Sequence, residues 1–296
     1  MIRELLEDAI ARSEELRRSL SDADLLRRAA SLWVRYRPSP REARKAGIDS
    51  GWNYRQLQGF YLYAVDAASV DQYAGYVAEP RHELGVSTME LEVRGRIIHE
   101  PHLFLEAKGM AFEGELAFES SPKVDLVLLD GSFIARTSSQ GLRLIPGYED
   151  AISRIPSLGN VVFIAKRSQG RELLGGPLGD IFYFSRASAS AGFSAPCSTK
   201  GVTHFYARLE DGAECLRIEV VGDMGAPPCD EASRDGDWKE VMRLLDELAH
   251  GAVGGYPYVL IQAHEIAHIG DREMEAIANL LGAGILESGR EVLGER

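Results

Sequence analysis

Two short apolar runs constrain the fold of this chain more than any other feature. The segment VDLVLLDGSF, residues 124–133, carries a run that stops at Asp130 and Gly131, and VVFIA, residues 161–165, repeats the pattern. Strands that are apolar on both faces are typical of the covered centre of a sheet. Together with the helical patterns elsewhere in the chain, the two runs predict an α/β domain.

Length and composition bound the class of protein. A chain of 296 residues is long enough for a substantial core, and 45% hydrophobic with 26% charged residues excludes a disordered chain. Residues 2–35 have helical apolar spacing that ends before Pro38 and Pro40. We therefore expect a helical extension over residues 1–46 in front of one domain over residues 47–296.

The sequence also predicts a compartment. It contains no run of about 18 apolar residues, and its N-terminus has no apolar signal-peptide core. The three cysteines, Cys197, Cys215 and Cys229, are odd in number and form no CxxC pair. We expect reduced thiols in a cytoplasmic protein.

The acidic balance of the chain does not exclude a nucleic-acid substrate. The net charge is −12, but residues 1–46 carry eleven Lys or Arg against eight Asp or Glu. Net charge governs solubility and non-specific attraction rather than the chemistry of one site. An enzyme that binds divalent ions through carboxylates can be acidic overall and still act on a polyanion.

Two aspartates follow predicted strands and point to metal chemistry. We expect one strand to end near Asp49 in GIDSG and another at Asp130 in LLDGSF. If these two strands lie side by side, both carboxylates converge on one edge of the sheet. A buried unpaired carboxylate is costly, and a divalent cation would offset that cost. A helix opened by Pro101 carries Glu106 and Glu113, either of which could add a third oxygen ligand for Mg²⁺ or Mn²⁺. The set suits two-metal phosphodiester hydrolysis, with ordinary turn aspartates as the alternative.

A second motif favours a different enzyme class. His264, Glu265 and His268 match the H-E-x-x-H pattern of zinc metallopeptidases, on a helix predicted from Tyr258 to Leu281. The two histidines would share one helical face and a Zn²⁺ ion, with Glu265 as general base. The nearest acid on that face, Glu275, lies about 16 Å further along the axis and cannot complete the site.

Five segments between Gly47 and Leu281, taken in order, resemble the NurA nuclease family: GIDSG with GFYLYAVDA, LVLLDGSF, VVFIAKRSQGREL, HFYARL with LRIEV, and GYPYVLIQAHEIAHI. The resemblance implies a ribonuclease H-like mixed sheet flanked by helices, with the N-terminal helical extension added. It also implies a manganese-dependent DNA nuclease for end resection and repair, acting as a 5′→3′ exonuclease and single-strand endonuclease. The family pattern further implies a homodimer that docks onto a HerA-type hexameric ATPase translocase.

The same resemblance assigns roles to residues of this chain. Asp49 and Asp130 would be metal ligands, His264 would complete the set of metal ligands and Tyr256 would line the site. Glu113 is the better match for the helical glutamate, with Glu106 second. The site would hold two ions of Mn²⁺, or of Mg²⁺ in its place.

Lys166, Arg167 and Arg171 follow a predicted strand in a glycine-containing turn and are candidates for binding DNA phosphates. The alternative for this turn is an ordinary solvated loop. A non-catalytic adaptor for a DNA motor remains an alternative for the chain as a whole.

Overall fold

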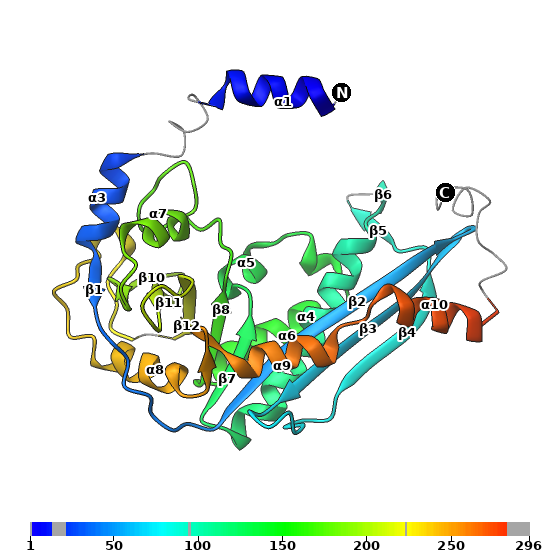
Figure 1. The fold of residues 1–296 in the computed structure, drawn as a ribbon. Coiled ribbons are helices and arrows are strands. Elements are labelled where there is room, and N and C mark those ends of the chain that lie inside the picture. Colours follow the sequence, from blue (N-terminus) through cyan, green and yellow to red (C-terminus); the bar gives the residue numbers. More distant parts are fainter. Residues whose placement is uncertain (1, 14–21, 94–95, 223, 283–296) are drawn as a thin grey trace.

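The computed structural model describes residues 2–13, 22–93, 96–222 and 224–282. One mixed sheet runs through the molecule in the order β1-β9-β11-β12-β8-β7-β2-β3-β4, with β10 paired to β11 (Figure 1). Its strands are β1 (Trp33–Arg35), β2 (Lys45–Leu57), β3 (Phe60–Val70), β4 (Arg81–Ser87), β7 (Leu126–Asp130), β8 (Val161–Ala165), β9 (Gly192–Ser194), β10 (Cys197–Thr199), β11 (Val202–Arg208) and β12 (Leu216–Val221).

The centre of the sheet confirms the expectation from the apolar runs. β2, β7 and β8 are parallel neighbours, and the outer strands join them antiparallel. Leu126 and Leu128 of β7 belong to one buried cluster, whereas Val127 and Leu129 belong to the cluster on the other face. Both faces of the central strands are therefore covered, as the continuous apolar pattern requires.

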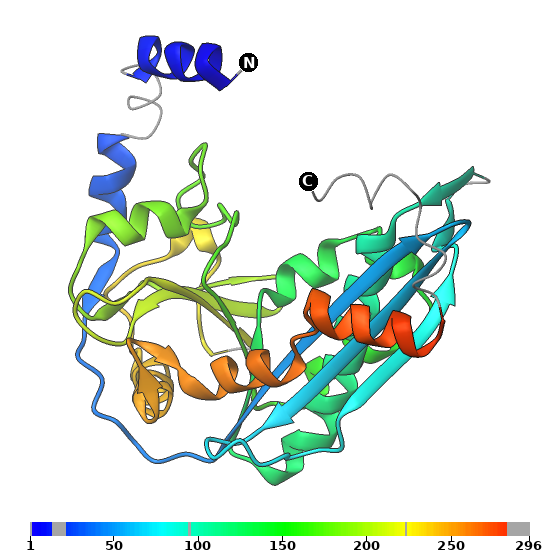
Figure 2. The same cartoon turned by 45° about the vertical axis from the view of Figure 1, so that its right-hand side comes forward.

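Helices cover the two faces of the sheet. Figures 1 and 2 show α9 and α10 crossing one face while α4 and α6 lie on the other. The longer helices are α1 (Ile2–Ala11), α3 (Ala23–Ser31), α4 (Pro101–Ser120), α7 (Asp180–Ala187), α8 (Lys239–Ala249), α9 (Tyr258–Ala267) and α10 (Asp271–Leu280). Shorter segments are α5 (Phe133–Ser138), α6 (Tyr148–Arg154), η1 (Ser121–Lys123), η2 (Leu142–Leu144), η3 (Ile155–Ser157) and η4 (Cys229–Glu231). None of the described helices is long and apolar enough to cross a membrane.

Two small sheets complete the fold. β5 (Glu90–Val93) pairs with β6 (Arg96–His99), and β13 (Ala252–Val253) pairs with β14 (Tyr256–Pro257). The second of these ribbons leads directly into α9.

The N-terminal segment is less uniformly helical than its spacing predicts. α1 buries none of its residues, and α3 begins at the N-cap Asp22, whose carboxylate accepts the backbone N–H groups of Asp24 and Leu25. Trp33–Arg35 then forms β1 rather than a helix. The reason is long-range pairing, because β1 lies antiparallel to β9 at the far edge of the sheet.

Two predicted boundaries are wrong. The first strand does not end at Asp49: β2 continues to Leu57 because its second half pairs with β3 in a long hairpin. The last helix is also broken. α9 ends at Ala267, His268 has an extended backbone, and a separate helix, α10, starts at Asp271.

The expectation of three reduced cysteines is wrong for two of them. Cys197 and Cys229 form a disulfide, while Cys215 is free and buried. The sequence spacing could not show this pairing, because 32 residues separate the two cysteines and the fold brings them together.

Candidate active site

Asp49 and Asp130 meet where two parallel strands separate. The pairing of β2 with β7 ends with Ile48 beside Leu129, so the next residues along the two strands are Asp49 and Asp130. β7 stops at this point, whereas β2 continues in its hairpin with β3. The prediction that the two carboxylates lie at the same edge is confirmed, although Asp49 lies within a strand and not at its end.

Glycines on either side of Asp49 let α9 approach the strand. A Cβ atom on Gly47 would overlap the carbonyl oxygen of Val259, and one on Gly51 would overlap that of Ala267. Side chains alternate between the faces of a strand, so Asp49 points to this same side. There its Oδ2 lies 2.8 Å from Nδ1 of His264, which α9 carries.

Glu113 reaches the cleft from α4, on the other side of β2. It is 3% exposed, and its Oε1 accepts a hydrogen bond of 2.5 Å from Oγ of Ser50. Its Oε2 lies 2.6 Å from Nη2 of Arg136, which also donates to the backbone oxygen of Asp130 at 2.7 Å. Glu106 lines the same cleft but is exposed.

These groups line a cleft of about 790 Å³. Carboxylates and cations both line it. The charged lining residues are Asp49, Glu106, Glu113, Asp130, Arg136, Lys166, Arg167 and His264. The apolar lining residues include Trp52, Leu103 and Met110.

The carboxylates of this cleft repel one another. Burial and the charge of Glu113 raise the pKa of Asp49 to about 6, with a further contribution from Asp130, against the hydrogen bond from His264. A raised carboxyl pKa means that the ionised form lacks compensation in these surroundings. A divalent cation would supply that compensation, and the donors are the hard oxygens that Mg²⁺ and Mn²⁺ bind. The residues present therefore fit such an ion.

Tyr256 is not among the residues that line the cleft, but it lies beside the aspartates. It is 8% exposed, and burial together with the charges of Asp130 and Asp49 raises its pKa. The phenol is therefore protonated and hydrogen-bonds to Asp130. Nζ of Lys166 lies 3.9 Å from the centre of the Tyr256 ring, a cation–π distance that holds the lysine at the cleft.

The three predicted phosphate-binding residues separate into two groups. Lys166 and Arg167 follow β8 directly and line the cleft. Arg171 is exposed, and its guanidinium donates to the backbone oxygen of Pro177 at 3.4 Å. It is not among the residues that line this cleft.

The helix behind the zinc-peptidase alternative is shorter than predicted. His268 is the C-cap residue of α9, and its ring centre lies 6.1 Å from that of His264. His264 is already paired with Asp49, 2.8 Å from its carboxylate.

Some residues of the site were not predicted from the sequence. Arg136 is buried between Glu113 and the Asp130 carbonyl, and Ser132 caps α5 while donating to Glu219 of β12 at 2.7 Å. The residue after Asp49, Ser50, was detectable as a polar neighbour within GIDSG. Arg136 and Ser132 join the site because elements distant in the sequence pack together, and no local sequence pattern predicts this.

The sequence of this chain also matches a known protein family. The NurA domain model matches residues 44–269. The DNA double-strand break repair nuclease NurA of Saccharolobus solfataricus is 25% identical over 290 residues, which cover 80% of this chain and 79% of that protein.

Solved structures show the same fold. The crystal structure of the NurA nuclease from Sulfolobus solfataricus matches with a TM-score of 0.77 and 21% identity, over 96% of this chain and 98% of the other. A NurA structure bound to dAMP and manganese matches with a TM-score of 0.61 and 12% identity, over 98% of both chains.

Proposed function

We propose that this chain, which belongs to the NurA family, is a metal-dependent nuclease that hydrolyses DNA phosphodiester bonds. The observation that carries the proposal is the meeting of Asp49 and Asp130 at the divergence of two parallel strands, with Glu113 as a third carboxylate. The names of the relatives agree, since one is a double-strand break repair nuclease and another binds dAMP and manganese.

Neighbouring side chains position the carboxylates of the cleft. Asp49, Asp130 and Glu113 would hold two divalent ions, which when bound activate a water molecule and stabilise the leaving oxygen. His264 orients Asp49 through their 2.8 Å contact. Arg136 fixes the Asp130 backbone and balances part of the charge of Glu113.

Two cations would position the substrate. Lys166 and Arg167 lie at the same cleft and would bind the phosphates next to the cleaved bond. Trp52, which also lines the cleft, offers a surface on which a base could stack. Positioning of this kind suits a polyanionic strand that runs along the carboxyl ends of the central strands.

The test is cleavage of labelled single-stranded DNA with Mn²⁺, with and without EDTA. Asp49→Ala and Asp130→Ala should each lose at least about 1000-fold in rate, because loss of metal-ion catalysis removes several kcal/mol of transition-state stabilisation. Asp66→Asn is the matched control, since Asp66 is on β3 opposite Gly51 but lines a different cleft. Full activity in either alanine variant, with native circular dichroism, would refute the proposal.

We infer that Mn²⁺ is the working ion, with Mg²⁺ as a weaker substitute, and that cleavage runs 5′→3′ from ends and also opens single strands internally. The manganese in a NurA structure of the same fold supports the choice of ion. Substrates labelled at the 5′ or the 3′ end test the polarity, and circular single-stranded DNA tests internal cleavage.

We also propose that the chain forms a homodimer and docks onto a HerA-type hexameric translocase. The support is α1, on which Ile2, Leu5, Leu6 and Ile10 are all at least 59% exposed. Deletion of residues 2–12 should weaken binding to the translocase and leave DNA cleavage by the isolated nuclease intact. Unchanged binding would show that α1 does not dock the translocase. The division of the chain at residues 46 and 47 stays a prediction.

A further inference from the structure

A second group of metal-ligand side chains lies away from the cleft, in the outer part of the sheet. Cys197 on β10 is the register partner of His204 on β11. Cys229 begins η4 and comes from 25 residues further along the chain. The backbone holds the two sides together, because the N–H of Ser198 donates to the oxygen of Pro227 at 2.8 Å.

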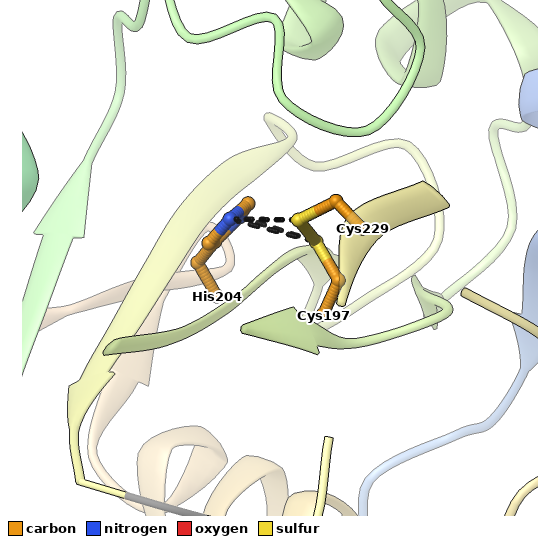
Figure 3. A group of neighbouring side chains, drawn as sticks. All are labelled: Cys197, His204 and Cys229. Carbon is orange, nitrogen blue, oxygen red and sulfur yellow. Dashed lines mark hydrogen bonds between the residues drawn. A yellow bond between two sulfur atoms is a disulfide. The ribbon is translucent and has the colours of Figure 1, made fainter. Parts of the chain in front are cut away.

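The donor atoms of these three residues converge. Nε2 of His204 lies 3.5 Å from Sγ of Cys197 and 3.4 Å from Sγ of Cys229. All three donor atoms lie within 4.8 Å of one another, and in the described residues no other His, Cys, Asp or Glu group of three does so. Figure 3 shows the imidazole edge facing the sulfur pair.

Burial and a nearby hydroxyl complete the surroundings. Cys197 and His204 are fully buried, whereas Cys229 is partly exposed. Oγ1 of Thr199 lies 3.2 Å from Nε2 of His204 and 3.3 Å from Sγ of Cys229. A fourth donor, either this hydroxyl or a water that enters beside Cys229, can therefore reach the same point.

The sulfur atoms are bonded to each other in this structure. A dithiol reductant would convert the disulfide into two thiols and would itself become a cyclic disulfide, a two-electron exchange in which no other reagent is consumed. Two thiols and one imidazole then face a common centre. Thiolate and imidazole are the ligands that Zn²⁺ prefers, and each thiol would release its proton on binding.

We propose that Cys197, Cys229 and His204 form a redox-controlled zinc site, which binds Zn²⁺ when the disulfide is reduced and releases it when a disulfide oxidant accepts two electrons from the thiolates, re-forms the Cys197–Cys229 bond and is itself reduced to thiols. In either state the segment at η4 stays tied to β10. The site also differs in chemistry from the carboxylate cleft: sulfur and nitrogen donors select Zn²⁺, and the oxygen donors of the cleft select Mn²⁺ or Mg²⁺.

Titration of the full chain with Co²⁺ tests the site without interference from the cleft. Charge transfer from thiolate to Co²⁺ absorbs in the near ultraviolet, and carboxylates cannot produce it. The protein is reduced beforehand with a phosphine, which turns the disulfide and one water into two thiols and a phosphine oxide. We expect the band to reach a plateau as Co²⁺ is added, to disappear when Zn²⁺ is added, and to be absent from the oxidised protein.

Variants locate the ligands. Cys197→Ser and Cys229→Ser should abolish the band, whereas Cys215→Ser, the matched control at the buried free cysteine, should retain it. A band in the oxidised protein, no band in the reduced wild-type protein, or a band kept by Cys197→Ser would each overturn the proposal. The comparison of reduced with oxidised wild-type protein holds even where a variant fails to fold.

Discussion

Two groups of charged side chains lie on either side of β8 in the sheet order, and they differ in how the charge is balanced. In the cleft, three carboxylates from β2, α4 and β7 face one buried arginine, Arg136. On β12, Arg217 lies between Glu219 and Glu172, a set that we call the ionic network. The network meets its hydrogen-bonding needs within the protein, whereas the cleft does not.

The hydrogen bonds of the ionic network account for this difference. Nε of Arg217 donates to Oε1 of Glu219 at 2.6 Å, and Nη1 donates to Glu172 at 2.9 Å. The other carboxylate oxygen of Glu219 accepts the backbone N–H of Ile134 at 3.0 Å. Burial opposes ionisation of Glu172, but the hydrogen bonds and charge of Arg217 outweigh it and lower its pKa.

The contrast separates a structural ion pair from a site built for a ligand. A buried carboxylate that has its cation and its donors within the protein needs nothing more. Asp49 has a raised pKa because it is buried and its neighbours are other carboxylates, and this marks the place where an external cation is expected. The two groups also touch, since Glu219 binds Ser132 two residues after Asp130.

Removing the cation of the network should have the largest effect on stability. In Arg217→Met the buried Glu219 and the half-buried Glu172 lose their partner, and we expect the free energy of unfolding to fall by about 3 to 5 kcal/mol. Denaturant unfolding measures the change. Arg243→Met is the control, because Arg243 pairs with Glu240 at 2.7 Å on the exposed face of α8 and should lose less than about 1 kcal/mol. Equal losses of unfolding free energy in Arg217→Met and Arg243→Met would show that the ionic network stabilises the fold no more than an exposed ion pair.

Removing a carboxylate from the cleft should lower the rate of DNA cleavage. Glu113→Gln removes a carboxylate charge from the metal-binding set, and we expect Mn²⁺-dependent cleavage to slow by about 100-fold, or roughly 2.7 kcal/mol. Glu106→Gln is matched in chemistry, helix and cleft, but Glu106 is exposed and should lose less than about threefold. A larger loss in Glu106→Gln would exchange the roles of the two glutamates.

The sequence predicts the centre of the fold and the meeting of Asp49 with Asp130, because both follow from local patterns. The apolar runs identify β7 and β8, and parallel neighbours bring their carboxyl ends to one edge. What the sequence misses depends on distant partners. The second half of β2 is fixed by its pairing with β3, and Trp33–Arg35 becomes a strand because β9 is beside it.

Charged residues in the interior are the hardest to predict. Arg136 and Arg217 resemble surface arginines in sequence, and their burial makes sense only beside carboxylates from other elements. The length of the last helix was mispredicted for a related reason: the chain leaves the helix at His268, and α10 then packs separately on β3.

Asp180 provides a third case, a buried carboxylate held by backbone donors alone. It is fully buried and accepts the N–H groups of Leu173 and Leu174 at 2.8 and 3.2 Å. Burial outweighs these hydrogen bonds and raises its pKa to about 6. The folded state then holds the proton more tightly than the unfolded chain, so its stabilising contribution is full below about pH 4 and is lost as the pH rises through 6.

The variant Asp180→Asn carries no charge at any pH. The free energy of unfolding of the wild type, minus that of the variant, should fall by roughly 2 to 3 kcal/mol between pH 4 and pH 7. Asp125→Asn should show a smaller slope of opposite sign, because hydrogen bonds from Arg44 lower the pKa of the exposed Asp125. A difference for Asp180→Asn that does not change with pH would contradict this account.

The smallest expected effect concerns the cations at the cleft margin. Lys166 lies on the Tyr256 ring and lines the cleft, whereas Arg171 lies outside it. Lys166→Ala should weaken binding of single-stranded DNA in EDTA by about threefold to tenfold. It should also reduce the slope of log affinity against log salt by about 0.7, the value for one lost phosphate contact. Arg171→Ala should change affinity by less than about twofold. If the two variants lose equally, the strand extends beyond the cleft across the turn that carries Arg171.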